Sequence, residues 1–233
     1  MTSPSEHSAY DTLRTAILSL DLVPGEKLSE RGLESLLGTS RTPIRAALGR
    51  LQGEGLTQRV DRGWRVSPLE FSEIRAVMEY REAIEVAVVE LALVHSSDEE
   101  LSALSLIATA HDDLDNEETG LRDGGDFHLA LARLSGNHFM SDALSASLTR
   151  LSRTRWLEVR TPESRALARR EHLDIIAALV ARDCVLATSL VVSHGRGSRD
   201  RLLNLLSQER QRLRGRGFAI IESGASATLR IPR

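Results

Sequence analysis

Two arginines and a threonine have the spacing of a base-reading surface. Arg41 and Arg45 are four residues apart, and Thr42 lies beside them. On a helix these side chains project from the same exposed N-terminal half. The planar fork of arginine can pair with O6 and N7 of guanine or with two phosphate oxygens. We therefore predict that this half-helix enters the major groove of double-stranded DNA.

Two short helices with a tight turn between them are predicted to position these residues. The first begins after Ser29, a candidate N-cap, and ends at Gly38, whose missing side chain suits a left-handed turn. Ser40 is the candidate cap of the second, and Pro43 falls in its first turn, where an N–H would have no partner anyway. The buried faces of the two helices are expected to carry Leu33, Leu36, Leu37, Ile44, Ala47, Leu48 and Leu51.

A two-stranded wing is predicted after the second helix. Residues 56–60 (LTQRV) alternate in polarity, residues 61–63 contain the turn formers Asp and Gly, and residues 64–66 (WRV) resume the alternation. This pattern favours a β-hairpin with a basic tip, which would lie beside the duplex. An alternative is a small helical subdomain whose arginines are merely solvated, but the combination with the wing makes it less favourable.

The first 68 residues are nearly neutral, although DNA is a polyanion. They contain nine Lys and Arg against eight Asp and Glu, a net charge of +1, whereas the whole chain carries −3. DNA affinity would then depend on a few well-placed arginines and on a second subunit, because there is no diffuse positive field. A homodimer is therefore part of the hypothesis.

Composition narrows the class of protein. A chain of 233 residues is long enough for two domains with cores of their own. A single cysteine, Cys184, excludes an internal disulfide framework, and we expect its thiol to be buried or half-buried near a helix junction. No apolar run approaches the roughly 20 residues that span a bilayer, and the N-terminus lacks the apolar core of a signal peptide. We expect a cytoplasmic protein with no membrane contact.

Beyond Pro68 the pattern changes to long helical periods. Six successive helices are predicted between Ser72 and about Leu213, which gives an all-α bundle. The acidic stretch at 111–120 is expected to be a solvated helix end and loop. The following segment, residues 214–233, breaks the helical pattern; its apolar run at 218–221 could be a docked strand, and we assign the segment no function.

Three histidines fall inside predicted helices of this bundle: His128, His172 and His194. Facing helices commonly build metal or ligand sites in a bundle interior. Because the three lie on separate helices, no short-range motif supports such a site. Ordinary core or surface histidines are the simpler interpretation on the residues alone.

Three segments of the N-terminal part carry a recognisable pattern: residues 24–30 (PGEKLSE), 40–48 (SRTPIRAAL) and 63–66 (GWRV). Together they resemble the winged helix-turn-helix of the GntR family. The resemblance implies that the DNA contacts come from Arg31, Arg41, Thr42 and Arg45, with Gly63 at the wing tip approaching the minor groove. Two departures are Ala46, where the family usually has an acidic residue, and Gly32, which weakens its helix by about 1 kcal/mol relative to Ala.

The bundle also contains short motifs of a known kind. These are residues 80–85 (YREAIE), 127–128 (FH) with Leu131, 135–137 (SGN), 171–172 (EH) and His194. They resemble the FCD domain that marks the FadR subgroup of the GntR family. The resemblance implies an all-α domain for effector binding and dimerisation.

Many members of this subgroup bind a divalent cation such as zinc through three histidines and an aspartate. The aspartate stands four residues before the first histidine, and here that position is Gly124. Asp123 and Asp126 would point about 140° and 160° away from His128 on a regular helix. Only a helix that begins after the 124–125 glycine pair could bring Asp123 round. Three imidazoles can still hold Zn²⁺ or Ni²⁺, with water or a ligand carboxylate completing the shell.

An ion with an open position, walled by helices, would suit a small carboxylate effector. We expect an effector oxygen to coordinate the ion while an arginine pairs with the effector's charge, and Asn137 is a further candidate contact. The candidate arginines are Arg81, Arg150, Arg153 and Arg155, each of which could instead be solvated or form a dimer salt bridge. Effector binding would shift the two recognition helices through Pro68 and residues 69–71, the covalent link.

The sequence as a whole predicts a mainly α protein in three segments: a winged helix-turn-helix DNA-binding domain at 1–68, an all-α effector-binding and dimerisation domain at 69–213, and a tail at 214–233. The predicted function is a ligand-responsive, sequence-specific repressor of a catabolic operon, which binds operator DNA and an organic acid and is not an enzyme. A metal-dependent hydrolytic enzyme and an architectural DNA-binding protein are the alternatives. Against an enzyme, the chain has no glycine-rich phosphate loop, nucleophile elbow or HExxH helix.

Overall fold

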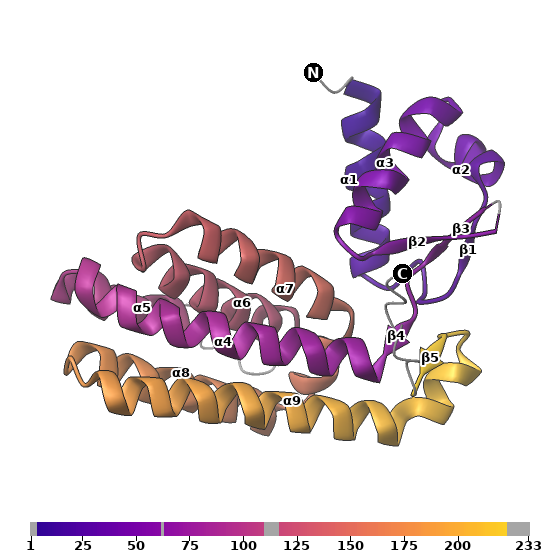
Figure 1. The fold of residues 1–233 in the computed structure, drawn as a ribbon. Helices are drawn as coiled ribbons and strands as arrows, with labels where there is room; N and C mark the ends of the chain where they lie inside the picture. The colour runs from indigo at the N-terminus through magenta and orange to yellow at the C-terminus, as the bar shows by residue number, and fades with distance from the viewer. Residues whose placement is uncertain (1–3, 62, 110–116, 223–233) are drawn as a thin grey trace, which may run out of the picture.

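The computed structural model describes residues 4–61, 63–109 and 117–222, with the backbone alone at 4–7 and 117–124. Arg62 at the predicted wing tip and most of the acidic stretch at 111–120 lie outside these ranges. Figure 1 shows two parts, a small unit of helices and a sheet at the N-terminus and an elongated bundle of helices after it. The mainly α fold predicted from the sequence is confirmed.

The N-terminal unit consists of a helix-turn-helix followed by a wing. In chain order its elements are α1 (Pro4–Leu18), β1 (Lys27–Leu28), α2 (Glu30–Leu37), α3 (Arg41–Gly53), β2 (Thr57–Val60) and β3 (Gly63–Val66). The wing strands β2 and β3 are antiparallel, with Arg59 opposite Trp64, and Asp61 enters the turn with a φ of 52°. Strand β1 pairs with the other edge of β3, which adds a third strand that was not predicted.

One hydrophobic core joins α1, the helix-turn-helix and the wing. Its fully buried members include Ile17, Ile44, Leu48, Leu51, Leu56 and Val66. The predicted buried positions of α3 are therefore confirmed. Leu36 was predicted wrongly, because its side chain is 71% exposed. Helix α2 packs chiefly against α3, and this one neighbour covers only Leu33 and, in part, Leu37.

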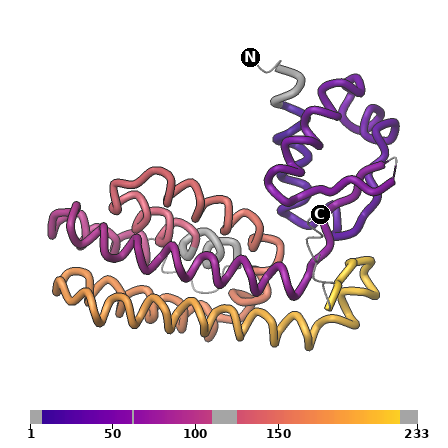
Figure 2. The backbone as a smooth tube through the Cα atoms, in the orientation of Figure 1, coloured from indigo at the N-terminus to yellow at the C-terminus, as the bar shows by residue number. Residues whose placement is uncertain are grey.

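Six helices of the described residues form the bundle: α4 (Phe71–His95), α5 (Asp98–Ala108), α6 (Glu117–Leu134), α7 (His138–Glu158), α8 (Pro162–Val180) and α9 (Cys184–Gly215). Helix α4 lies against α6, α7 and α9, and α8 packs on α5 and α9. Figures 1 and 2 show α4 and α9 side by side. The core of the bundle contains Val88, Val89, Phe127, Leu131, Leu144 and Ile175. No helix in the described ranges is long and apolar enough to cross a membrane.

Helix ends in the bundle follow signals that are visible in the sequence. The Thr161 hydroxyl accepts the N–H of Ser164 at 3.2 Å, and Pro162 occupies the first turn of α8. Asp183 caps α9 by accepting a backbone N–H of its first turn at 2.9 Å. Cys184 was expected to be at least half-buried, but it is exposed, because it is the first residue of α9 and lies outside the apolar contacts between helices.

The segment after α9 returns to the junction of the two parts. Strand β5 (Ile220–Ile221) pairs in parallel with β4 (Leu69–Glu70), which confirms the predicted docked strand. The N–H of Leu69 donates to the carbonyl of Ala219 at 2.9 Å, and the N–H of Ala219 donates to the carbonyl of Pro24 at 2.7 Å. The tail therefore joins the link between the two parts to the α1–β1 loop, in addition to the covalent connection. Residues 223–233 of the predicted tail lie outside the described residues.

A glycine substitution tests this tail contact. Gly25 has a φ of 90°, and a Cβ there would lie 2.3 Å from the Cβ of Ala219. Gly25→Ala should lower the free energy of unfolding by about 1–3 kcal/mol, because it adds backbone strain and a clash with the tail. Gly49→Ala is the control: a Cβ at Gly49 would meet no described neighbouring segment within 4 Å, so the change should stabilise α3 by up to about 1 kcal/mol. Denaturant unfolding followed by circular dichroism measures both, and equal effects would contradict the contact.

Candidate functional site

The candidate recognition helix, α3, is positioned by the turn before it. The Ser29 hydroxyl accepts the N–H of Gly32 at 3.0 Å, and Gly38 ends α2 with a φ of 62°, as predicted. Ser40 stands at the N-cap position of α3, but within the described chain its hydroxyl makes no capping hydrogen bond. Completely buried Ile44 anchors this half of α3 to the core. The turn and the core thus fix which face of α3 is exposed.

The side chains predicted to contact DNA lie on the surface. The exposed set is Arg31, Arg41, Thr42 and Arg45. A groove of about 540 Å³ lies between the wing and residues 27–30 of β1 and the start of α2, and Arg45 of α3 also lines it. The guanidinium of Arg59 lies 4.9 Å from the centre of the Trp64 ring, so the wing side of the groove also carries a cation.

Two carboxylates of α2, which sequence reasoning missed, hold Arg41 and Arg45 in the first half of α3. Nε and Nη2 of Arg45 donate to Glu30 at 2.9 and 2.7 Å, and Nε of Arg41 donates to Glu34 at 2.8 Å. The hydrogen bonds from Arg45 are the main reason that the pKa of Glu30 is lowered. No short-range signal shows this pairing, because Glu30 and Arg45 meet only when α2 packs on α3.

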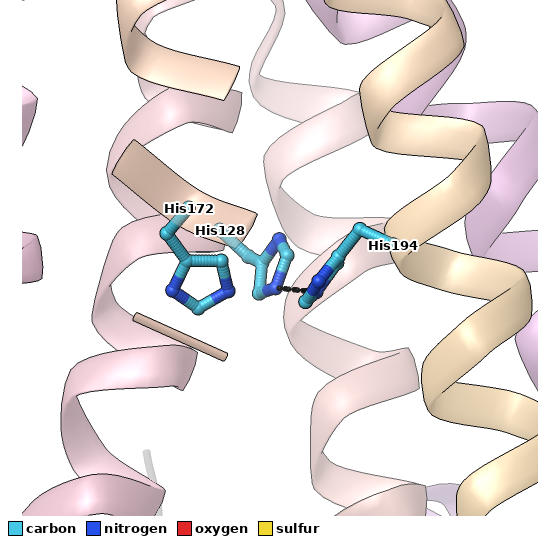
Figure 3. Close-up of side chains that lie close together, drawn as sticks. All are labelled: His128, His172 and His194. Carbon is cyan, nitrogen blue, oxygen red and sulfur yellow. Dashed lines mark hydrogen bonds between the residues drawn. The ribbon is translucent and has the colours of Figure 1, made fainter. Parts of the chain in front are cut away.

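Three histidines from three helices meet inside the bundle, as Figure 3 shows. His128 lies on α6, His172 on α8 and His194 on α9, and all three are buried. One ring nitrogen of each lies within 4.8 Å of the others. The fold therefore brings together the three candidate metal ligands that the sequence suggested, and we call them the histidine trio.

Carboxylates fix the orientation of two of these rings. Nδ1 of His128 lies 2.7 Å from Oε1 of Glu85, and Nδ1 of His194 lies 2.7 Å from Oε2 of Glu171. An ionised carboxylate can only accept a hydrogen bond, so each ring carries its hydrogen on Nδ1 and presents a lone pair on Nε2. The two Nε2 atoms are 3.3 Å apart, the contact drawn in Figure 3. Because facing lone pairs repel, a cation between them would be well placed.

Burial keeps the imidazoles of His128 and His172 neutral. Burial, reinforced by the positive charge of Arg81, lowers the pKa of His128 to about 3. The pKa of His172 is held well below its usual value by burial and by the other two histidines. Its Nε2 has no hydrogen-bond partner among the described residues. Neutral imidazole with an available lone pair is the form that binds a transition metal.

A buried arginine competes for one of these lone pairs. Nη2 of Arg81 lies 2.6 Å from Nε2 of His128, and its Nε lies 3.2 Å from Oε2 of Glu85. A guanidinium has donors only, so it uses the lone pair that a metal would take. Burial alone would raise the pKa of Glu85, but the charge of Arg81 and the hydrogen bond from His128 outweigh burial and lower it. The trio is thus part of a network in which His128 contacts the ion pair of Arg81 and Glu85.

Comparison with known proteins decides the family. The family described as "Bacterial regulatory proteins, gntR family" matches residues 6–66, and the FCD domain matches residues 76–197. The chain belongs to the GntR family. It is a transcriptional regulator of the GntR type with a C-terminal FCD effector-binding domain, as the sequence resemblance predicted.

Relatives of this GntR-family chain are named as regulators. It is 30% identical to the Nta operon transcriptional regulator of Aminobacter aminovorans, over 78% of this chain and 87% of that one. It is 29% identical to the HTH-type transcriptional repressor RspR of Escherichia coli, over 78% and 82% of the two chains. A GntR transcriptional regulator from Rhodococcus sp. RHA1 has the same fold, with a TM-score of 0.72 at 18% identity, over 87% of this chain and 99% of that one.

The trio fits a divalent metal in its donors, although this regulator lacks the aspartate that the resemblance led us to expect. Helix α6 already begins at Glu117, so Gly124 lies inside the helix. The loop route by which Asp123 could approach His128 is therefore not available, and the Asp123 side chain lies outside the described residues. Asp126 is exposed, in agreement with its predicted angle. The fit to a metal rests on the three imidazoles.

The arginines expected near an effector take different places in the regulator. Arg81 contacts His128 of the trio. Arg155 is buried near Arg81, and burial together with the positive charge of Arg81 lowers the pKa of Arg155 to about 10. Arg150 forms an ion pair with α4 at 2.9 Å, and Arg153 donates to the carbonyl of Ser67. Arg150 and Arg153 therefore contact the region where the two domains meet.

Asn137, the other expected effector contact, lies at the start of α7. Its side-chain oxygen accepts the N–H of Phe139 at 3.1 Å and caps the helix. Within the described residues no hydrogen bond joins it to the trio. The fold thus brings Arg81 to the candidate site but does not bring Asn137 there.

A pair of serine substitutions tests how the helix-turn-helix is held. Ser29→Ala should cost about 1 kcal/mol of folding free energy, because it leaves the N–H of Gly32 without its side-chain partner. Ser40→Ala, at the N-cap without a side-chain bond, should cost clearly less. Denaturant unfolding compares the two variants. A larger loss for Ser40→Ala would show that the caps are assigned the wrong way round.

Proposed function

We propose that this regulator represses a catabolic operon and that a small carboxylate, bound in the helical bundle, changes its affinity for operator DNA. One observation supports the DNA-reading part above all: Arg41, Thr42 and Arg45 are exposed on α3, and Arg45 lines the groove that the wing borders. Arginine at such a place can pair with guanine in the major groove. In the same proposal Arg31 contacts the DNA backbone and Gly63 lets the wing approach the minor groove.

The proposed division of labour follows the chain. Residues 1–68 bind DNA, residues 69–213 bind the effector and a second copy of the chain, and the tail at 214–233 contributes the strand that braces the junction. The net charge of +1 on the first segment supports a homodimer, because a single unit offers few phosphate contacts. We place the protein in the FadR subgroup and in the cytoplasm, where operator DNA is found.

The proposed effector site is the histidine trio with Arg81. His128, His172 and His194 would hold Zn²⁺ or Ni²⁺, and a bound ion would supply a Lewis-acidic position for a carboxylate oxygen. Arg81 would pair with the effector's remaining charge. Because Nη2 of Arg81 lies on the lone pair of His128, it has to move when a metal binds. A carboxylate is a new partner for the displaced guanidinium.

Helix α7 supplies the proposed route from this site to the DNA-binding domain. Arg155 is in the electrostatic reach of Arg81 and Glu85, and Arg153, two residues earlier, is bonded to the carbonyl of Ser67 in the link. The side chain of Arg150 lies against Gly55, where an added Cβ would come within 2.2 Å of it. A shift of α7 would therefore move the contacts of Arg153 with the link and of Arg150 with Gly55, just after α3. Effector binding has to favour one such placement over another to change DNA affinity.

The two alternative functions are less well supported. A hydrolytic metal enzyme needs a general base beside the ion, but Glu85 and Glu171 both face the Nδ1 side of their histidines. An architectural DNA-binding protein would have no use for a buried network of histidines, arginine and carboxylate in a separate domain. We therefore propose that the chain is not an enzyme.

Fluorescence anisotropy with a labelled duplex from the chain's own upstream region tests the proposal. We expect saturable binding that is weaker for a scrambled duplex and that changes when a panel of small organic acids is added. Equal binding to the scrambled duplex would remove sequence-specific reading, and indifference to the whole panel would remove the effector.

In the same titration Arg45→Ala should weaken binding to the upstream duplex by about 1–3 kcal/mol and leave the fold intact. Arg133→Ala is the matched control, because Arg133 is an exposed arginine of the bundle and its loss changes the net charge equally. If the two variants bind alike, Arg45 does not read DNA.

Metal content tests the histidine trio. Protein purified, stripped with a chelator and reloaded with Zn²⁺ or Ni²⁺ should hold the metal, and His172→Ala should lose it, because two imidazoles and no described carboxylate ligand would remain. His138→Ala, an exposed histidine at the start of α7, is the control and should retain it. Elemental analysis by mass spectrometry gives the stoichiometry, and a full equivalent of metal on His172→Ala would show that the ligands are wrongly assigned.

A further inference from the structure

The pair between Arg45 and Glu30 uses one particular edge of the guanidinium. Nε donates to Oε1 at 2.9 Å and Nη2 donates to Oε2 at 2.7 Å, which is a bidentate pair along the side of the group. A guanidinium has five N–H donors in a fixed plane, and this pair occupies two of them. The side edge of Arg45 is thus taken by a carboxylate of α2.

The opposite edge of the same group remains available for a base. Nη1 carries two hydrogens and Nη2 has a second one, so two parallel donors still point along the end of the side chain. Guanine presents two acceptors, N7 and O6, to the major groove, and an arginine fork matches them. Arg45 can therefore hold Glu30 and a guanine at the same time. The side chain of Arg45 is 59% exposed, which leaves room for the second partner.

Glu30 is itself firmly placed. It is the first residue of α2, directly after the cap Ser29, and its side chain is only 20% exposed. It lines the groove beside the wing together with Arg45 and Trp64. Arg41 differs, because it meets Glu34 through Nε alone in a single hydrogen bond of 2.8 Å. Of the two arginines, Arg45 is the one whose plane is fixed.

We propose that Glu30 is a positioning residue for sequence reading: it holds the side edge of Arg45 so that the end edge meets a guanine. This rests on the proposed DNA contact of Arg45. The carboxylate fixes the plane of the guanidinium before DNA arrives, so less rotamer freedom is lost on binding. Its negative charge also disfavours the use of Arg45 as a simple clamp on phosphates. Glu30 therefore strengthens binding to the right sequence and weakens binding to the wrong one.

Replacement of Glu30 by glutamine separates this role from packing. An amide has the same shape, but it offers one acceptor and one donor group, and the donor would face an N–H of Arg45. Glu30→Gln thus breaks the bidentate pair and removes one negative charge. Asp21→Asn is the matched control, because it removes the same charge from an exposed carboxylate of the same domain, whose described bond is to Ser19. Glu30→Asp keeps the carboxylate and should restore part of the effect.

The experiment begins with selection of duplexes from a randomised library by the full-length wild-type protein. The guanine read by Arg45 is identified as the one whose replacement lowers the affinity of wild type but not that of Arg45→Ala. Two forms of the selected duplex are then made, one with this guanine intact and one with 7-deazaguanine, which lacks the N7 acceptor. Affinities for both forms are measured for wild type, Glu30→Gln, Glu30→Asp and Asp21→Asn. Wild type and Asp21→Asn should lose about tenfold in affinity on this replacement. Glu30→Gln should lose less than about threefold, while its affinity for a scrambled duplex stays equal or rises. Thermal unfolding confirms that all variants are folded.

The outcomes distinguish the inference from the function on which it rests. If wild type selects no sequence, or no guanine responds to Arg45→Ala, the DNA-reading role of Arg45 fails and the inference fails with it. If wild type selects such a guanine and Glu30→Gln shows the full penalty for 7-deazaguanine, the function stands and the positioning role of Glu30 is overturned.

Discussion

The negative charge of Glu85 lies in the interior of the bundle, and the polar centre of that domain is arranged around it. Taking a carboxylate out of water costs several kcal/mol, which is offset only where partners are close and well aligned. Here the partners are Nε of Arg81 at 3.2 Å and Nδ1 of His128 at 2.7 Å. This pairing decides the tautomer of His128 and turns its Nε2 toward the other two histidines. Glu171 does the same for His194 and is itself held by Arg201 at 3.0 Å. The direction of the lone pairs, and with it any metal or anion chemistry, follows from these carboxylates.

The same network extends toward the DNA-binding domain because α7 passes both the histidine trio and the link between the domains. Arg155 feels the charge of Arg81, while Arg153 is buried and bonded to the carbonyl of Ser67 in the link. The tail adds a second connection, since Ala219 bonds both to Leu69 and to Pro24. Two domains joined by one short link would be free to reorient, whereas these contacts restrict them to a small set of placements. A restricted set of placements is what a ligand-controlled switch requires.

The proposed DNA-reading surface relies on geometry more than on charge. Arg41 and Arg45, the two arginines in the first half of α3, are each paired with a carboxylate of α2, so they present little unbalanced positive charge. A surface of this kind attracts DNA of any sequence only weakly, because non-specific binding depends on the number of phosphates neutralised. It can still discriminate between sequences, since discrimination depends on the direction of donors. The pairing of Arg45 with Glu30 is one reason why residues 1–68 are nearly neutral, because the carboxylate balances the guanidinium.

The sequence by itself determined whatever depends on neighbours a few residues apart. Apolar spacing predicted the buried face of α3, Ser29 and Gly38 marked the ends of α2, and the alternation at 56–66 predicted the wing. Local patterns could not show that Leu36 has nothing to pack against, because that depends on how many neighbours α2 acquires. Only the tertiary structure decided which polar groups meet: Glu30 with Arg45, Glu85 with His128, and Ala219 with Pro24. The physical reason is that helix and strand propensities act over one or two turns, whereas hydrogen bonds and ion pairs form between any groups that packing of the core brings within about 3 Å.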